Sequence, residues 1–68
     1  MTRPPNMEPG AEVRLLRKGM GITQEWLAQL MGVSPVTVSR WECGIRKPGK
    51  HVLVLVRIIA EMHPSRTE

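Results

Sequence analysis

The stretch "TQEWLAQLMGVSPVTVSRWECG", residues 23–44, carries the start and stop signals of two short helices with almost nothing between them. Thr23 is a good N-cap residue, because its side-chain oxygen can accept a hydrogen bond from the first turn of a helix. Gly32 is typical of the left-handed residue that ends a helix. The sequence therefore predicts a helix over residues 24–31. Its inward side is expected to consist of Leu27, Ala28 and Met31.

Another helix is predicted directly after this one. Only Val33 lies between the glycine that ends one helix and the residue that caps the next. Ser34 is the expected N-cap, and Pro35 suits the first helical position because it has no N–H to satisfy. Gly44 is the expected stop. This helix is predicted to cover residues 35–43.

Helical periodicity divides the helix predicted over residues 35–43 into two sides. Val38 and Trp41 lie three residues apart, carry the bulk, and are expected to face the core. The opposite side consists of Val36, Ser39, Arg40 and Cys43. It has little bulk apart from one arginine, and a helix of this length fits the major groove of B-DNA, which is roughly 12 Å wide. This side is therefore either a base-reading surface or an ordinary solvent-exposed face.

The chain has 68 residues, a formal net charge of +4 and a pI of about 10.3. It is long enough for one domain only. A small basic chain favours nucleic acid or another anionic surface as a partner, and the alternative is a solvated basic face. Four basic residues cluster within a short segment, which favours nucleic acid: Arg40, Arg46, Lys47 and Lys50.

The residues needed for catalysis or metal binding are missing. The chain has no aspartate, which excludes a Ser-His-Asp triad. Cys43, His51 and His63 are too few and too scattered for a zinc site. A single cysteine cannot form an internal disulfide, which fits a reducing compartment. The sequence has no apolar run of membrane-spanning length and no apolar signal core. We therefore expect a cytoplasmic protein that is not an enzyme and needs no cofactor or metal.

The N-terminal part of the chain is expected to add an arm and one more helix. Residues 1–8 are predicted to be a flexible arm, because prolines and an asparagine are poor helix formers. The first helix is predicted to begin near Pro9, which suits a first-turn position, and to stop at Gly19. Its buried side is expected to consist of Val13, Leu16 and Met20.

A last helix is predicted over residues 51–62. The consecutive apolar residues from Val52 to Val56 would also suit a buried strand, but the sequence offers no second strand to pair with it. This helix is apolar on nearly all sides, so it is expected to bury more than one face. The whole pattern predicts an all-α, compact four- to five-helix domain over residues 9–63, followed by a C-terminal tail over residues 64–68.

The segment "TQEWLAQLMGVSPVTVSRWECGIRKP" resembles the helix-turn-helix of the Cro and lambda-repressor-like, XRE-type DNA-binding proteins. The likeness extends back to "VRLLRKGMGITQ" and covers about residues 11–50. The matching features are Thr23-Gln24, Leu27-Ala28, Gly32-Val33-Ser34, Val38, Trp41-Glu42, Gly44 and the basic residues before Pro48. Together they form a specific pattern. The resemblance implies a lambda-repressor-like fold and sequence-specific binding to double-stranded DNA.

The resemblance also implies roles for individual residues. The base-facing surface of the recognition helix would consist of Pro35, Val36, Ser39 and Arg40. The DNA phosphates would be contacted by Gln24, Thr37, Arg46, Lys47 and Lys50. Arg17 in the first helix would pair with Glu42, and this pair is interpreted as structural because it would orient the recognition helix.

Two residues of the helix predicted over residues 24–31 depart from the family pattern, which usually has polar residues there. Trp26 and Leu30 lie four residues apart and are expected to lie together on the outer side of the helix. They either form a surface for a protein partner or are covered by the N-terminal arm or the last helix. Family members commonly dimerise through the C-terminal helix, so the last helix is the other candidate contact surface.

We expect a small transcriptional regulator of the repressor kind that acts as a homodimer on double-stranded DNA. The alternative is an antitoxin-type protein that binds a toxin partner and represses its own operon. The small size of the chain and the apolar pair Trp26 and Leu30 suit this alternative.

Overall fold

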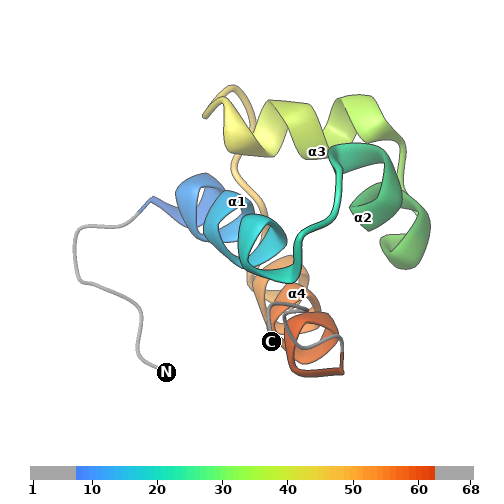
Figure 1. Cartoon of the computed structure of the whole chain (residues 1–68). Helices are drawn as coiled ribbons and strands as arrows, with labels where there is room; N and C mark the ends of the chain where they lie inside the picture. The colour runs from blue at the N-terminus through green and yellow to red at the C-terminus, as the bar shows by residue number, and fades with distance from the viewer. Residues whose placement is uncertain (1–7, 63–68) are drawn as a thin grey trace.

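The computed structural model of the chain describes residues 8–62, which form an all-α fold (Figure 1). The residues in this range contain no strand. The helices are α1 (Pro9–Met20), α2 (Gln24–Met31), α3 (Pro35–Glu42) and α4 (Lys50–Met62). The all-α prediction is therefore confirmed, with four helices in this part of the chain. The predicted arm up to residue 7, His63 and the predicted tail over 64–68 lie outside the described residues.

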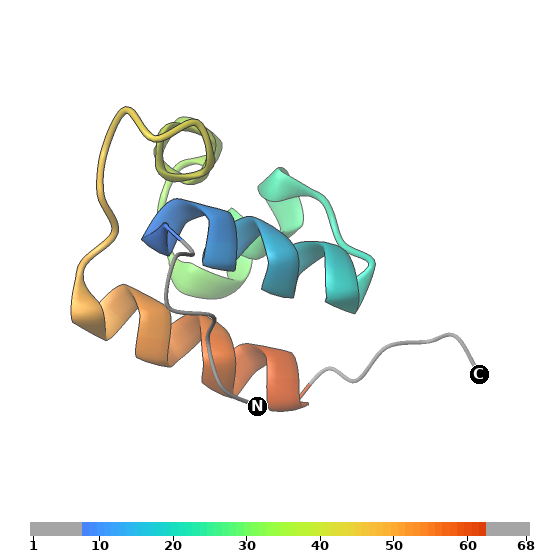
Figure 2. The same cartoon turned by 90° about the vertical axis from the view of Figure 1, so that its left-hand side faces the viewer.

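Helix α1 lies in the middle of the structure. Figures 1 and 2 show α3 on one side of it and α4 on the other. The contacts agree, because α1 packs against both of these helices, whereas α3 and α4 share no more than a marginal contact. Helix α2 packs mainly on α3 and more weakly on α4. The relative placement of α3 and α4 is therefore set mainly through α1.

The two predicted N-caps around the tight turn are confirmed. The Thr23 hydroxyl accepts a hydrogen bond from the backbone N–H of Trp26 at 3.0 Å, and the Ser34 hydroxyl accepts one from that of Thr37 at 3.2 Å. Gly32 ends α2 in the left-handed conformation, with φ = 75°, as expected. Glycine adopts this φ without the strain that a side chain would cause, so α3 can begin after a very short turn.

The first helix is longer than predicted. Gly19 lies inside α1, which ends at Met20. The C-cap is Gly21, which has φ = 74° and whose N–H bonds back to the carbonyl oxygens of Arg17 and Lys18. The predicted end at Gly19 is wrong because a glycine is tolerated within a helix. The helix ends at the glycine that adopts the left-handed conformation.

The bounds of the last two helices also differ slightly from the prediction. Helix α3 ends at Glu42 and not at residue 43, because Cys43 is the cap residue, with φ = −85° and ψ = −4°. Gly44 follows with φ = 80° and turns the chain away from the helix. Helix α4 begins at Lys50, one residue earlier than expected.

The core contains the inward sides that the sequence predicted for the first three helices. The fully buried side chains come from all four helices and are Val13, Leu27, Val38 and Val56. The other buried apolar residues are Met20, Ala28, Trp41, Leu53 and Ile59. Leu16 and Met31 are partly buried against this core. The helical periodicity therefore identified the correct sides of α1, α2 and α3.

Helix α4 buries only one side within the described chain, so the prediction that it buries more than one face is wrong here. Its buried residues are Leu53, Val56 and Ile59. Val52 is partly buried against the same core. The exposed large apolar residues of α4, at 41–70%, are Val54, Leu55, Ile58 and Met62. The physical reason is that α1 and α2 cover one side of α4, and residues 8–62 contain no further helix that covers the other.

None of the helices between residues 8 and 62 is long and apolar enough to cross a membrane.

Helices α1 and α3 come closest at Gly10. A Cβ atom placed on this residue would overlap the backbone carbonyl oxygen of Trp41. The constraint is space and not backbone conformation, because Gly10 lies within α1 and is not among the residues with positive φ. The missing side chain allows the start of α1 to pack directly on the end of α3.

We expect Gly10→Ala to destabilise the fold, because the new methyl group would overlap backbone atoms that cannot move without shifting α3. Overpacking of this kind costs about 1–3 kcal/mol, and in a domain of this size each kcal/mol lowers the melting temperature by roughly 4–8 °C. Thermal unfolding followed by circular dichroism measures the effect.

Gly19→Ala is the matched control on the same helix, because a Cβ atom there would meet no atom within 4 Å. This change should stabilise α1 by about 0.5–1 kcal/mol. Equal melting temperatures for the two variants would contradict the close contact between α1 and α3.

Candidate nucleic-acid interface

The outward side of α3 is the surface that the sequence analysis assigned to base reading. Pro35, Val36 and Arg40 are exposed, Val36 at 55%, and Ser39 is partly exposed. The opposite side of the helix is buried in the core. Because the buried side holds α3 in place, these four side chains share one accessible face of the helix.

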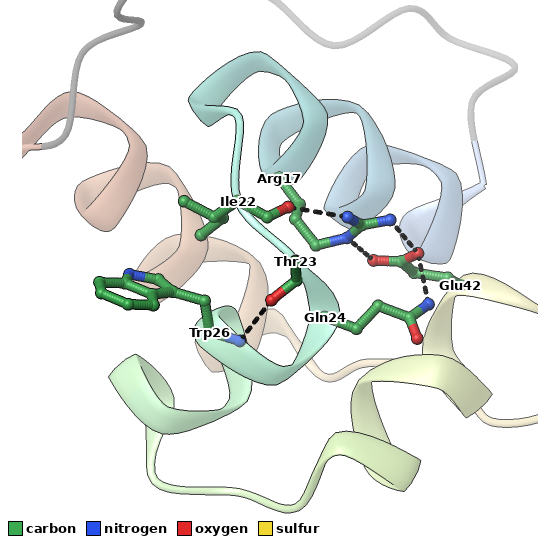
Figure 3. A network of polar contacts seen from close by, with 6 residues as sticks. All are labelled: Arg17, Ile22, Thr23, Gln24, Trp26 and Glu42. Atoms are coloured by element: carbon green, nitrogen blue, oxygen red, sulfur yellow. Dashed lines mark hydrogen bonds and ion pairs between the residues drawn. The ribbon is translucent and has the colours of Figure 1, made fainter.

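A polar network ties α3 to α1 at the edge of this face (Figure 3). Nε of Arg17 donates to Oε2 of Glu42 at 2.7 Å, and Nη2 donates to Oε1 at 3.0 Å. Nη1 of the same guanidinium donates to the carbonyl oxygen of Ile22 at 2.9 Å. The pair is largely buried, with side-chain exposures of 12% and 4%. One guanidinium therefore joins α1, the turn before α2 and the end of α3, and its paired bonds to the carboxylate restrict the angle as well as the distance.

Gln24 also contacts this carboxylate. Its Nε2 donates to Oε1 of Glu42 at 2.9 Å (Figure 3). The family resemblance implies a contact between Gln24 and a DNA phosphate, and the bond to Glu42, which joins residues 18 positions apart, is an additional contact. An amide nitrogen carries two hydrogens, and this bond uses one of them. The bond therefore holds the Gln24 side chain at the first turn of α2 without using up its capacity to donate.

The carboxyl of Glu42 is ionised at neutral pH. Burial opposes its negative charge, but hydrogen bonds from Arg17 and Gln24, together with the charges of Arg17 and Arg14, outweigh the effect of burial. The pKa of Glu42 therefore lies below its ordinary value of 4.5. The Glu42 carboxylate is therefore negatively charged, as its ion pair with the Arg17 guanidinium requires.

Arg14 belongs to the same edge and was missed in the sequence analysis. Gly10, Arg14 and Arg17 recur at i, i+4 and i+7 along α1. Gly10 packs on Trp41, and Arg17 binds Glu42. Arg14 therefore lies on the side of α1 that faces the end of α3. Its side chain is exposed. The spacing of Arg14 from Arg17 shows from the sequence that both residues lie on the same side of α1. Only the packing of α1 on α3 shows that this side faces the end of α3.

Four of the predicted phosphate contacts lie within α3 or follow it along the chain. The loop after α3 carries Arg46 and Lys47, and Lys50 begins α4; all three are exposed. Thr37 lies in the first turn of α3, where its hydroxyl shares a 3.0 Å hydrogen bond with that of Ser34. Three positive charges therefore follow the end of α3, and a partly buried hydroxyl lies near its start.

The apolar pair Trp26 and Leu30 lies on the outer side of α2, with exposed fractions of 55% and 39%. Figure 3 shows the Trp26 indole pointing away from the network around Arg17. The sequence analysis offered the last helix or the N-terminal arm as a segment that covers this pair. The last helix, α4, leaves both residues exposed and is therefore excluded. The N-terminal arm, the other one, lies outside the described residues up to residue 7.

A cleft of about 350 Å³ lies between the start of α1 and the loop after α3. Its lining includes Gly10, Trp41, Cys43 and Lys47. Within residues 8–62, no three His, Cys, Asp or Glu side chains gather into a group that could hold a metal ion.

Comparisons with known proteins agree with the arrangement of α2 and α3. Residues 13–56 match the family described as "Helix-turn-helix". The HTH-type transcriptional regulator DicA of Escherichia coli (strain K12) is 36% identical over 55 residues, which is 79% of this chain and 41% of DicA. The chain therefore spans less than half the length of this curated relative. No solved structure matches the chain significantly.

We expect Glu42→Gln to destabilise the fold at neutral pH by about 1.5–3 kcal/mol, the usual worth of a hydrogen bond to a charged group. The pKa of Glu42 is lower in the folded chain than its ordinary value of 4.5, so ionisation stabilises the fold above that pH. The stabilisation is lost as the pH falls from 4.5 through the lower folded value. Urea unfolding at a series of pH values measures this dependence.

The wild-type and Glu42→Gln stabilities should therefore converge as the pH falls below 4.5. Glu25→Gln is the matched control, because Glu25 is an exposed carboxylate in the first turn of α2. A wild-type advantage over Glu42→Gln that stays constant across the pH range would contradict a role for the Glu42 charge.

Proposed function

Because this chain belongs to the XRE-type helix-turn-helix family, we propose that it binds double-stranded DNA in a sequence-specific way and acts as a small transcriptional regulator. The proposal rests on one observation. The bulky side of α3 is buried in the core, and its small and polar side is exposed beside a basic loop. α3 has eight residues and is about 12 Å long, and the major groove is wide enough to admit an α-helix.

The base-reading role falls to the outward side of α3. Arg40 can make a bidentate pair with the O6 and N7 atoms of guanine. Val36 can contact the methyl group of thymine, and the Ser39 hydroxyl can bond several base edges. Pro35 at the first position would bring the start of the helix close to the groove. Support for this assignment comes from the shared face and the exposure of these four residues.

The phosphate-binding role falls to residues around α3. They are Gln24, Thr37, Arg46, Lys47 and Lys50, to which the packing of α1 adds Arg14. Contacts of this kind orient a protein on the duplex without reading its sequence. Gln24 would donate to a phosphate while it also holds Glu42, so the position of α3 and the contact with the DNA backbone would be coupled.

The exposed side of α4 supports a second copy of the chain as a partner. Leu55, Ile58 and Met62 recur at i, i+3 and i+7 and are exposed, with Val54 beside them. Two copies related by a twofold axis would bury this stripe against itself. A dimer would then place its two recognition helices in half-sites about 34–36 Å apart. A repressor acting in this way would occupy an inverted pair of half-sites.

A second candidate function rests on the exposed pair Trp26 and Leu30. Both residues lie on α2 and are exposed, which suits a protein partner, and the Trp26 indole points away from the Arg17 network (Figure 3). An antitoxin-type protein would use such a surface for its toxin and α3 for its own operator. The outward side of α3 and its basic flanks favour DNA binding as the main function.

Selection of bound sequences from a random double-stranded DNA pool, at two salt concentrations, tests the proposal. We expect enrichment of sites with two inverted half-sites about one helical turn apart. Enrichment of single half-sites would keep the DNA-binding function and reject the dimer. Absence of enrichment at both salt concentrations would reject the proposal and favour the protein-binding alternative.

We expect Arg40→Ala to relax the preference at one base pair of the selected site, at a cost of about 1–3 kcal/mol, because a bidentate pair with guanine would be lost. Titration of the four single-base variants of that site measures the change. Lys18→Ala is the control, because Lys18 is an exposed basic residue on α1 and not on α3. A base preference that survives Arg40→Ala unchanged would show that Arg40 does not read a base.

We expect Lys47→Ala and Arg14→Ala to weaken binding to all sequences and each to reduce the slope of log affinity against log salt by about 0.9, the value for one phosphate contact. Fluorescence anisotropy over a range of salt concentrations measures the slope. If Arg14→Ala leaves the slope unchanged, the role of Arg14 is limited to the charge balance around Glu42.

A further inference from the structure

The loop after α3 contains an isoleucine that the described part of the chain leaves uncovered. Ile45 is 75% exposed, more than any other large apolar side chain of residues 8–62. Its backbone is nevertheless held in place. The N–H groups of Ile45 and Arg46 both donate to the carbonyl oxygen of Arg40, at 3.0 and 3.2 Å. The chain therefore fixes the backbone of Ile45 beside Arg40 and leaves its side chain open to solvent.

The end of α3 forms a Schellman motif, which explains where Ile45 lies. The Gly44 N–H donates to the carbonyl oxygen of Trp41 at 3.2 Å, and the Ile45 N–H bonds one residue further back, to that of Arg40. Gly44 allows this turn because it adopts φ = 80°. The motif therefore brings Ile45 back toward the last turn of the helix.

The packing role that an apolar residue usually has at this position is missing. In a Schellman motif, the residue after the glycine commonly packs on an apolar side chain in the last turn of the helix. The two positions available for that contact are occupied by Ser39 and Arg40, and neither is apolar. Both belong to the outward side of α3. Ile45 therefore extends the outward side past the end of the helix.

The surroundings of Ile45 favour DNA over an apolar protein surface. Arg40 lies beside it, Arg46 and Lys47 follow it, and all three are exposed. Burial of these charges against an apolar protein surface would be costly. DNA offers phosphates to basic side chains, and its major groove also offers an apolar group, the 5-methyl group of thymine. An aliphatic side chain beside a base-reading arginine suits that group.

We propose that Ile45 is a further specificity-determining residue, which contacts the 5-methyl group of a thymine next to the base pair that Arg40 reads. The inference rests on the proposed function, because it presupposes that α3 lies in the major groove. Val36 is near the start of α3 and Ile45 is beyond its end, so the two would contact different thymines. The outward side would then read a methyl group at each end and hydrogen-bonding base edges between them.

Replacement of single thymines by deoxyuridine tests the proposal, because it removes the methyl group and keeps the hydrogen-bonding groups of the base. Each thymine of the site selected from the random DNA pool is replaced in turn. Fluorescence anisotropy gives the affinity of the wild-type protein, Ile45→Ala, Val36→Ala and Leu15→Ala for each DNA. Leu15→Ala is the matched control, because Leu15 is 53% exposed and belongs to α1, outside α3 and its loop.

We expect one replacement, next to the base pair whose preference Arg40→Ala relaxes, to lower the wild-type affinity about fourfold, the usual worth of one buried methyl-sized group. Ile45→Ala should lose most of its response to that replacement and keep its response to the others. Val36→Ala should lose its response at a different thymine. Leu15→Ala should respond as the wild type does. Because Ile45 is exposed, its replacement should leave the melting temperature unchanged.

Four results would overturn the proposal. An unchanged response of Ile45→Ala to every replacement would reject the base contact and leave the proposed function intact. A uniform loss of affinity, with every response to deoxyuridine retained, would place Ile45 against the DNA backbone. A clearly lower melting temperature of Ile45→Ala would show that its side chain packs within the chain. A wild-type protein that selects no DNA sequence would reject the proposed function itself, and the role of Ile45 with it.

Discussion

The guanidinium of Arg17 makes the contacts on which the placement of α3 depends. Its hydrogen bonds run to the carboxylate of Glu42 at the end of α3 and to the backbone of Ile22 before α2. Helix α3 has only eight residues, and a helix this short is not stable alone in water. Core contacts hold its inner side, and these charged bonds restrict its tilt. Gln24 bonds to the same carboxylate, so one buried charge joins the first three helices.

Helix α1 holds its two neighbours by different means. Gly10 allows α3 to approach by leaving out a side chain, and Arg17 adds the directional bonds. On the other side, Glu12 binds Arg57 of α4. Shape and charge together therefore relate a candidate DNA-reading surface on α3 to a candidate surface for a second copy on α4. This arrangement gives a small domain a way to link two surfaces that barely touch each other.

Sequence-based prediction succeeded where the signal is local. The N-caps at Thr23 and Ser34 and the left-handed Gly32 depend on residues within one helical turn of each other, and all three have the predicted conformation. The end of α1 was placed at Gly19, because a glycine does not reveal whether it lies inside a helix or ends it. The bond from Gln24 to Glu42 was missed, because it depends on how distant segments pack. The functional roles assigned to the exposed residues of α3 stay predictions.

The sequence by itself determined the four helices, most of their bounds and the inward sides of α1, α2 and α3, because caps and periodicity act over a few residues. Only the tertiary structure decided that Arg14 lies beside the end of α3 and that α4 leaves Leu55 and Ile58 exposed. Apolar residues extend around most of α4, so periodicity alone does not show which of them are covered. The packing of α1 and α2 on α4 decides this, and it buries Leu53, Val56 and Ile59.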